Sequence, residues 1–182
     1  DAIDEVTRGY RGARLDHCGI FYRDAQGAGV VVEAIPPRVV ATPLDAFLRR
    51  SKDAKGRPCV MVGRVVPVYA QLAPAAVTYS WSCIGRNYDK YFAENDTALY
   101  CSELIVYSYA HANNGKKIFS EYPMTFKDPI TGEVSKIWYE YFEKLGVAVP
   151  EGRIGSNPGA LSRDVNVAIH TQLGDIRGAP AL

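Results

Sequence analysis

The spacing of apolar and polar residues changes several times along the chain, and each change predicts a new element. Residues 16–23 and the β-branched run 30–35 are expected to form a hairpin, with a turn at 24–29 that contains Gly27 and Gly29. Further strands are expected at 59–69 and 165–172, and helices at 72–84, 98–113 and 134–145. Strands and helices do not alternate strictly, so the pattern predicts an α+β architecture.

Capping residues indicate where two of the helices begin. Thr42 precedes Pro43, which suits the first position of a helix, and this helix would run to about Ser51. The helix at 98–113 follows Asn95-Asp96-Thr97, three capping residues in a row. Its apolar residues cover most of its circumference, which predicts a central and buried helix.

Composition limits the class of protein. The chain has 182 residues, 47% hydrophobic and 23% charged, which suits one globular domain over 1–182. A net charge of +1 does not favour broad binding of nucleic acid or anionic membranes, and no apolar run is long enough to span a bilayer. The four cysteines are too few and too irregularly spaced for a disulfide scaffold or a zinc ribbon, although Cys59 and Cys83 could pair in an oxidising compartment. No cofactor or metal site is expected.

Cys101 carries the main chemical hypothesis, because it lies near the start of the central helix. A cysteine attacks as a thiolate, and a helix N-terminus supplies positive potential and unpaired amides that stabilise one. The backbone N–H of Cys101 would also face a developing oxyanion. A single cysteine in an apolar helix is more often a packed core residue, so the hypothesis needs a base nearby.

His17 and Glu33 are the candidate base and its carboxylate partner. Glu33 lies within an apolar strand, where a carboxylate is costly unless it faces solvent or has a partner. If the hairpin closes around residues 24–26, His17 lies directly opposite Glu33 on the same face. A slip of one residue would move Glu33 to the other face. The alternative is that His17 is an ordinary surface or capping residue.

Other residues are weaker candidates. The Tyr88 hydroxyl could donate to an oxyanion, but tyrosine is abundant, with 12 copies, and a packed aromatic is the commoner role. His111 and His170 are weaker candidates for the base, and His111 fits better as a helix-end residue. His17 and Cys18 are neighbours in the expected strand and point apart, so one metal ion cannot easily bind both.

Four short pieces of the sequence resemble the YiiX/YebB-like family, circularly permuted relatives of the NlpC-type papain-like cysteine peptidases and amidases. They are Asp16-His17-Cys18-Gly19-Ile20, Val32-Glu33-Ala34, Tyr88-Asp89-Lys90-Tyr91-Phe92 and Tyr100-Cys101-Ser102-Glu103-Leu104, in that order. Two later pieces, 137–141 and 150–159, also look like members of this family, so the similarity covers roughly 15–163. The resemblance implies a permuted papain-like fold, with a small antiparallel sheet or barrel packed on the helix that carries the cysteine.

The same resemblance implies a role for each matching residue. Cys101 would be the nucleophile, His17 the general base, Glu33 the carboxylate that orients it, and Tyr88 a residue near the oxyanion site. Cys18 departs from the family, because relatives usually carry an aliphatic residue there, and it is expected to point into the core. The implied reaction is acyl transfer from an amide to water through an acyl-enzyme.

The substrate follows from the resemblance alone. Relatives act on cell-wall peptides, which implies a small or murein-type peptide as the substrate and a bacterial cell-envelope location. A lipid acyltransferase or thioesterase on the same scaffold is one alternative, and a non-catalytic binding module is another. The lipid alternative would require an apolar groove and often a membrane anchor, and no anchor is visible in the sequence.

Overall fold

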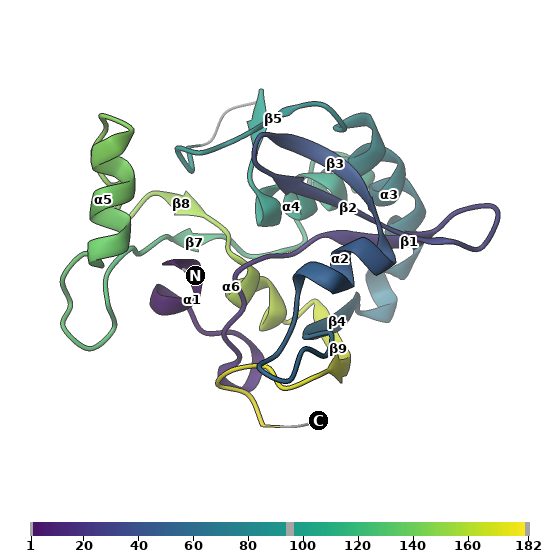
Figure 1. The fold of residues 1–182 in the computed structure, drawn as a ribbon. Helices are drawn as coiled ribbons and strands as arrows, with labels where there is room; N and C mark the ends of the chain where they lie inside the picture. The colour runs from purple at the N-terminus through teal and green to yellow at the C-terminus, as the bar shows by residue number, and fades with distance from the viewer. Residues whose placement is uncertain (1, 94–96, 181–182) are drawn as a thin grey trace.

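A five-stranded sheet lies at the centre of the computed structural model, which describes residues 2–93 and 97–180 (Figure 1). The strands run in the order β1 (Ile20–Arg23), β2 (Gly29–Ile35), β3 (Arg38–Pro43), β5 (Asn87–Tyr88) and β6 (Ala98–Leu99). Neighbours are antiparallel except for β5 and β6, which are parallel. The α+β architecture expected from the pattern is confirmed.

Strand β2 is buried along most of its length, which explains its run of β-branched residues. Val32 and Ala34 belong to an apolar core shared with helices α3 (Ala73–Ser82) and α4 (Cys101–Ala112). Alternate side chains of a strand point to opposite faces, so Glu33 points away from this core. Its carboxylate is nevertheless fully buried, because other elements cover that face.

Helix α2 (Leu44–Arg50) follows β3 directly, and its start differs from the prediction. Pro43 precedes the helix, and Thr42 is part of β3, so Thr42 does not cap the helix. Its hydroxyl donates to Glu33 instead. The apolar pattern does not reveal β3, because Pro36 and Pro37 precede it and indicate a turn, and Pro43, its last residue, indicates a helix start.

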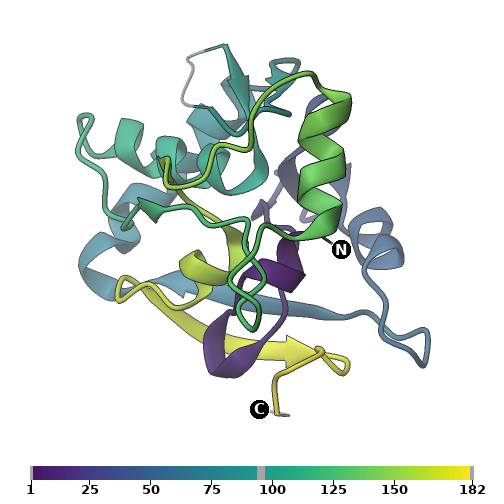
Figure 2. The same cartoon turned by 90° about the vertical axis from the view of Figure 1, so that its left-hand side faces the viewer.

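The remaining elements form two groups beside the sheet (Figures 1 and 2). Strands β4 (Val60–Val65) and β9 (Val167–Leu173) pair as an antiparallel ladder near the C-terminus. The second group contains helix α1 (Ala2–Val6), strands β7 (Tyr122–Pro123) and β8 (Ile154–Gly155), and helices α5 (Lys136–Lys144) and α6 (Pro158–Ser162), of which α6 contacts β9. Two short 3-10 helices span Tyr10–Gly12 and Pro67–Leu72. No helix of the described residues is long and apolar enough to cross a membrane.

A second, aromatic core joins α5 to the segment that precedes α4. Its members are buried rings and one thioether: Phe92, Tyr100, Met124, Phe126, Trp138 and Phe142. The indole of Trp138 also donates to the carbonyl oxygen of Ala2 at 3.0 Å, which holds α1 against α5 (Figure 2). These contacts place an apolar wall beside the first residue of α4.

Candidate active site

Cys101 is the first residue of α4, and its side chain is almost completely buried. The preceding residue, Tyr100, donates its backbone N–H to the Glu103 carboxylate at 3.3 Å, which stabilises the start of the helix. The backbone N–H of a first helical residue has no partner within the helix. Cys101 therefore combines a thiol, an available amide and the positive end of a helix dipole.

The capping residues expected for this helix do not determine where it begins. Asn95 and Asp96 lie outside the described residues. Thr97 precedes strand β6, and the helix begins at Cys101 rather than at residue 98. The expected helix was therefore correct in type and in its C-terminal half, but three residues too long at its start.

His17 and Glu33 meet as expected, with His17 Nε2 2.6 Å from Glu33 Oε2. The pairing that brings them together is offset by two residues from the prediction, because Ile20 lies opposite Val32 rather than opposite residue 30. An offset of two keeps every side chain on its face, whereas an offset of one would not. The register was wrong, but the shared face of the two residues was predicted correctly.

Gly19 explains how the segment that carries His17 can run so close to β2. A Cβ atom at this position would lie 2.5 Å from Val31 Cγ1 and 2.9 Å from the carbonyl oxygen of Val32. Both distances are shorter than van der Waals contact. Only glycine fits here without moving the backbone, and the close approach holds His17 within reach of Glu33.

Two further residues bind the Glu33 carboxylate. The hydroxyl of Thr42 donates to Oε1 at 2.5 Å. One terminal nitrogen of Arg50, Nη2, contacts both carboxylate oxygens, at 2.5 and 2.6 Å. Burial by itself raises the pKa of Glu33, but the hydrogen bonds from His17, Arg50 and Thr42 lower it to about 2. Glu33 is therefore ionised throughout the physiological range.

The sequence reasoning missed both Thr42 and Arg50. The sequence pattern predicts a helix cap at Thr42. The signal for Arg50 was a carboxylate inside an apolar strand, since such a group requires a donor or a cation. That signal does not say which of the 21 lysines and arginines supplies it.

Cys101 and His17 shift each other's pKa toward the charged forms. Burial lowers the pKa of His17, but the Cys101 sulfur and the Glu33 carboxylate outweigh burial and raise it to about 9. The pKa of Cys101 lies well below its usual range because of hydrogen bonds from Cys18 and His17, which outweigh the opposing effect of burial. Since Nε2 of His17 is bound to Glu33, Nδ1 is the ring nitrogen left for Cys101. Both shifts favour a thiolate beside an imidazolium.

Cys18 does not simply point into the core, as the alternation of a strand predicted. It is half-buried at the border of an apolar cluster that contains Val106, and its thiol hydrogen-bonds Cys101. The reason is that β1 begins only at Ile20, so strict alternation does not apply at Cys18. The thiolate beside it raises the pKa of Cys18, and burial adds to this effect. All four cysteines are free, so Cys59 and Cys83 are not paired.

Tyr88 lies on β5 near the thiolate. Burial and then the negative charge of Cys101 raise the pKa of its hydroxyl far above the usual value, so it remains a proton donor. His111 lies in the last turn of α4, as expected of a helix-end residue, and its ring stacks on Tyr79 with centroids 4.3 Å apart. His170 is exposed on β9. His17 is thus the histidine that contacts Cys101.

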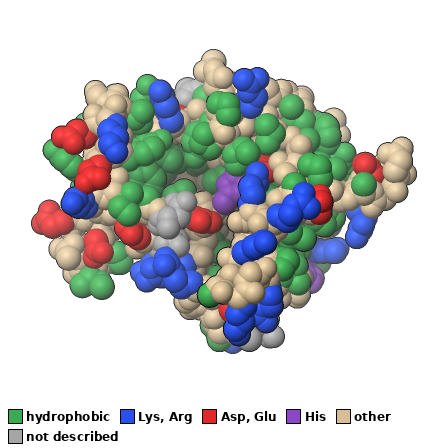
Figure 3. Space-filling view, viewed as in Figure 1, with side chains coloured by type: hydrophobic (Ala, Val, Ile, Leu, Met, Phe, Trp, Pro, Cys, Tyr) green, Lys and Arg blue, Asp and Glu red, His purple; other side chains and the backbone are tan. Residues whose placement is uncertain are grey.

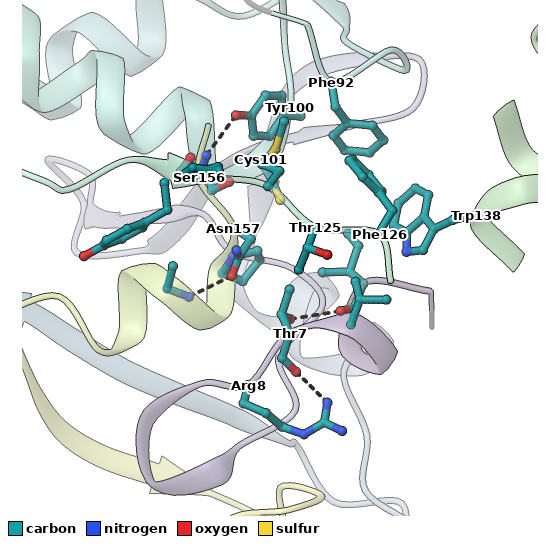
Figure 4. A pocket seen from close by; sticks show the side chains of 18 of the residues that line it. Thr7, Arg8, Phe92, Tyr100, Cys101, Thr125, Phe126, Trp138, Ser156 and Asn157 are labelled. Atoms are coloured by element: carbon teal, nitrogen blue, oxygen red, sulfur yellow. Dashed lines mark hydrogen bonds between the residues drawn. The ribbon is translucent and has the colours of Figure 1, made fainter. Parts of the chain in front are cut away.

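A cavity of about 230 Å³ opens beside Cys101 (Figure 4). One wall is apolar, and its side chains come from α1, α5 and the segments between them: Ile3, Val6, Phe92, Met124, Phe126 and Trp138. Polar residues also line the cavity, among them Thr7, Arg8 and Asn157. The space-filling view shows a hollow in this face, with hydrophobic side chains around it (Figure 3).

Two serine hydroxyls belong to residues that line this cavity. Ser102 follows the cysteine in α4, and Ser156 follows β8. Both hydroxyl oxygens are buried, and neither has a hydrogen-bond partner among the described residues. Buried polar atoms are rarely left without a partner, which distinguishes these two hydroxyls from the bonded groups around Glu33.

Comparison with known proteins identifies a family and a structural neighbour. A family model described as permuted papain-like amidase enzyme, YaeF/YiiX, C92 family, matches residues 3–166. A solved structure, the metalloprotein yiiX from Escherichia coli O157:H7, superposes with a TM-score of 0.73 at 21% identity. The superposition covers 96% of this chain and 89% of that one. No curated protein matches the chain.

The solved neighbour is named a metalloprotein. Within 2–93 and 97–180, no group of three or more histidine, cysteine, aspartate or glutamate side chains is arranged to hold a metal ion. The facing atoms of His17 and Glu33, Nε2 and Oε2, bind each other. Among the described residues, these side chains do not form a metal-binding set.

Proposed function

This chain belongs to the permuted papain-like amidase family of the YaeF/YiiX type, C92, and we propose that it hydrolyses amide bonds through a triad of Cys101, His17 and Glu33. The observation that carries the proposal is the linear chain of contacts from a thiol at a helix start, through an imidazole, to a fully buried carboxylate. These are the parts of a cysteine hydrolase, in which the base activates the thiol and the carboxylate orients the base.

The reaction follows from the protonation states of these groups. The Cys101 thiolate attacks the carbonyl carbon of the amide and forms a tetrahedral oxyanion. The His17 imidazolium gives its proton to the leaving nitrogen, the C–N bond breaks, and an acyl-enzyme remains on the sulfur. A water molecule then attacks the thioester while His17 accepts its proton. The acid is released and the thiolate–imidazolium pair is restored.

Two donors suit the oxyanion. The backbone N–H of Cys101 lies at the helix start, where the helix dipole favours negative charge. Tyr88 is near the sulfur, and its hydroxyl keeps its proton. We assign Tyr88 to oxyanion stabilisation on these grounds.

The lining of the cavity indicates which groups a substrate would carry. Its apolar wall would hold an aliphatic or aromatic group next to the scissile bond, and its polar side would bind peptide groups. A small or murein-type peptide matches both sides, and such a substrate would place the enzyme in the bacterial cell envelope. The apolar wall also favours a second candidate, an acyl transfer or thioester reaction on a lipid.

The test uses purified wild-type protein and Cys101→Ala, each incubated with murein fragments and, separately, with N-acyl and ester lipids. Mass spectrometry of the products should show cleavage of an amide by the wild type and none by the variant. Release of fatty acid from lipids alone would select the second candidate. Binding of murein fragments without cleavage by either protein would contradict hydrolysis and indicate a binding module.

A further inference from the structure

Arg50 approaches the buried carboxylate from the last turn of α2. Its Nη2 lies 2.5 and 2.6 Å from the two oxygens of Glu33, while 46% of the Arg50 side chain remains exposed. The guanidinium also lies over the ring of Phe47, 5.6 Å from its centroid, and the same ring is 6.1 Å from that of His17. Helix α2 thus holds Arg50 at the edge of the triad, between Glu33 and solvent.

The charges alternate along this line of contacts. Arg50 is positive, Glu33 negative, the His17 imidazolium positive and the Cys101 thiolate negative. The groups that face Glu33 are Arg50 from α2, the Thr42 hydroxyl from β3, and His17 from the segment before β1. Cys101 begins α4 on the other side of His17, next to the neutral thiol of Cys18. Without Arg50, the other three charged groups would carry a net charge of −1 in a largely buried space, which is unfavourable.

We propose that Arg50 is a positioning residue of the active site, which keeps the Glu33 carboxylate ionised and in place and sets the pH range in which the thiolate–imidazolium pair exists. The inference rests on the proposed function, since it concerns the same triad. It adds a fourth member that touches neither the substrate nor the reacting atoms.

A simpler role for Arg50 would be to stabilise the C-terminus of α2, where any cation is favourable. Arg49, its neighbour in the same turn, offers a direct comparison. Arg49 pairs with Asp45 one helical turn away, and both side chains are about two-thirds exposed. A helix-end role predicts similar effects from changing Arg49 or Arg50. A role in the triad predicts an effect from Arg50 only.

The test measures the alkylation of Cys101 by iodoacetamide between pH 4 and pH 9, with each cysteine quantified by mass spectrometry. In Arg50→Met the midpoint of the rise in rate should move to higher pH by roughly 0.5–1 unit, because removal of a nearby cation disfavours the thiolate. Arg50→Lys should show a smaller shift in the same direction, because one ammonium keeps the charge but not the forked geometry. Arg49→Met should leave the midpoint unchanged. Thermal unfolding at pH 7 shows which variants are folded.

The outcomes separate this inference from the proposed function. A wild type in which Cys101 reacts no faster than Cys59 would contradict the proposed function itself. A wild type with a reactive Cys101, together with a folded Arg50→Met that keeps the wild-type midpoint, would overturn the role of Arg50 alone. If Arg50→Met does not fold, the test rests on Arg50→Lys. An unchanged alkylation midpoint in Arg50→Lys would then overturn the role of Arg50.

Discussion

The two sides of Cys101 are built in opposite ways. On the side of His17, the ring nitrogen Nε2 and both Glu33 oxygens are bound, and Thr42 and Arg50 complete the set. On the side of the cavity, the wall is mostly apolar and the buried Ser102 and Ser156 hydroxyls have no partner among the described residues.

This difference suggests that the triad side carries out the reaction and the cavity side binds the substrate. A fully bonded carboxylate and imidazole need not reorganise when charge moves during the reaction, which is how preorganised sites lower barriers. A mostly apolar cavity gains binding free energy when it buries an apolar group of a ligand. Changes on the triad side should therefore alter rates and pH dependence, and changes on the cavity side should alter substrate affinity.

The largest effect is expected from Cys101→Ala. Without the nucleophile, the rate of amide hydrolysis should fall by about 10³-fold or more, as measured by mass spectrometry of the products. Cys59→Ala is the control, because Cys59 lies away from the site and its thiol contacts the carbonyl oxygen of Asp175. Equal activity of the two variants would place the reaction elsewhere in the molecule.

The second-largest effect is expected from Glu33→Gln. Its kcat should fall by about 10²- to 10⁴-fold, because an amide neither orients His17 correctly nor stabilises its charge. It should also alter stability in acid. The pKa of Glu33 is lowered from 4.5 to about 2 in the folded state. The ionised carboxylate therefore stabilises the fold above pH 4.5, and this contribution is lost as the pH falls from 4.5 through 2.

The loss of stability in acid is measured by denaturant unfolding at pH 7, 4 and 3. The free energy of unfolding of the wild type should fall over this range by more than that of Glu33→Gln. Glu140→Gln serves as the control, since Glu140 forms an exposed pair with Lys136 on α5 and such pairs contribute little. A wild type and Glu33→Gln with parallel pH profiles would contradict the linkage.

On the cavity side, Thr125→Trp should weaken substrate binding. Thr125 is exposed at the cavity, so a larger side chain can obstruct it without disturbing the core. KM should rise about tenfold, equivalent to about 1.4 kcal/mol, while the alkylation rate of Cys101 by the small reagent iodoacetamide changes less. Thr131→Trp, on the exposed turn nearby, is the control. A fall in kcat at constant KM would contradict the division between the two sides.

The smallest effect is expected from Cys18→Ala. The Cys18 thiol helps to hold the pKa of Cys101 low, so its loss should slow alkylation of Cys101 a few-fold at pH 6 and leave the rate at pH 9 almost unchanged. The measurement is the pH dependence of alkylation at Cys101. A uniform reduction at all pH values would instead indicate a change in packing.

The sequence by itself determined the parts of this protein that depend on local patterns. The apolar period of α4, the β-branched run of β2 and the short Gly-containing link between the first two strands are each visible within a few residues. The position of Glu33 among apolar neighbours signalled a partner. The two-residue error in the register did no harm to the prediction that His17 and Glu33 meet, because an even offset keeps side chains on their face.

Only the tertiary structure decided which residues complete the site. Thr42 and Arg50 reach Glu33 from a strand and a helix that pack over it, and Cys18 contacts Cys101 because the chain is irregular before β1. The cavity is assembled from α1, α5 and segments more than a hundred residues apart. Periodicity reports the face on which a side chain lies, but it does not report which distant element covers that face. That choice depends on how the elements pack together.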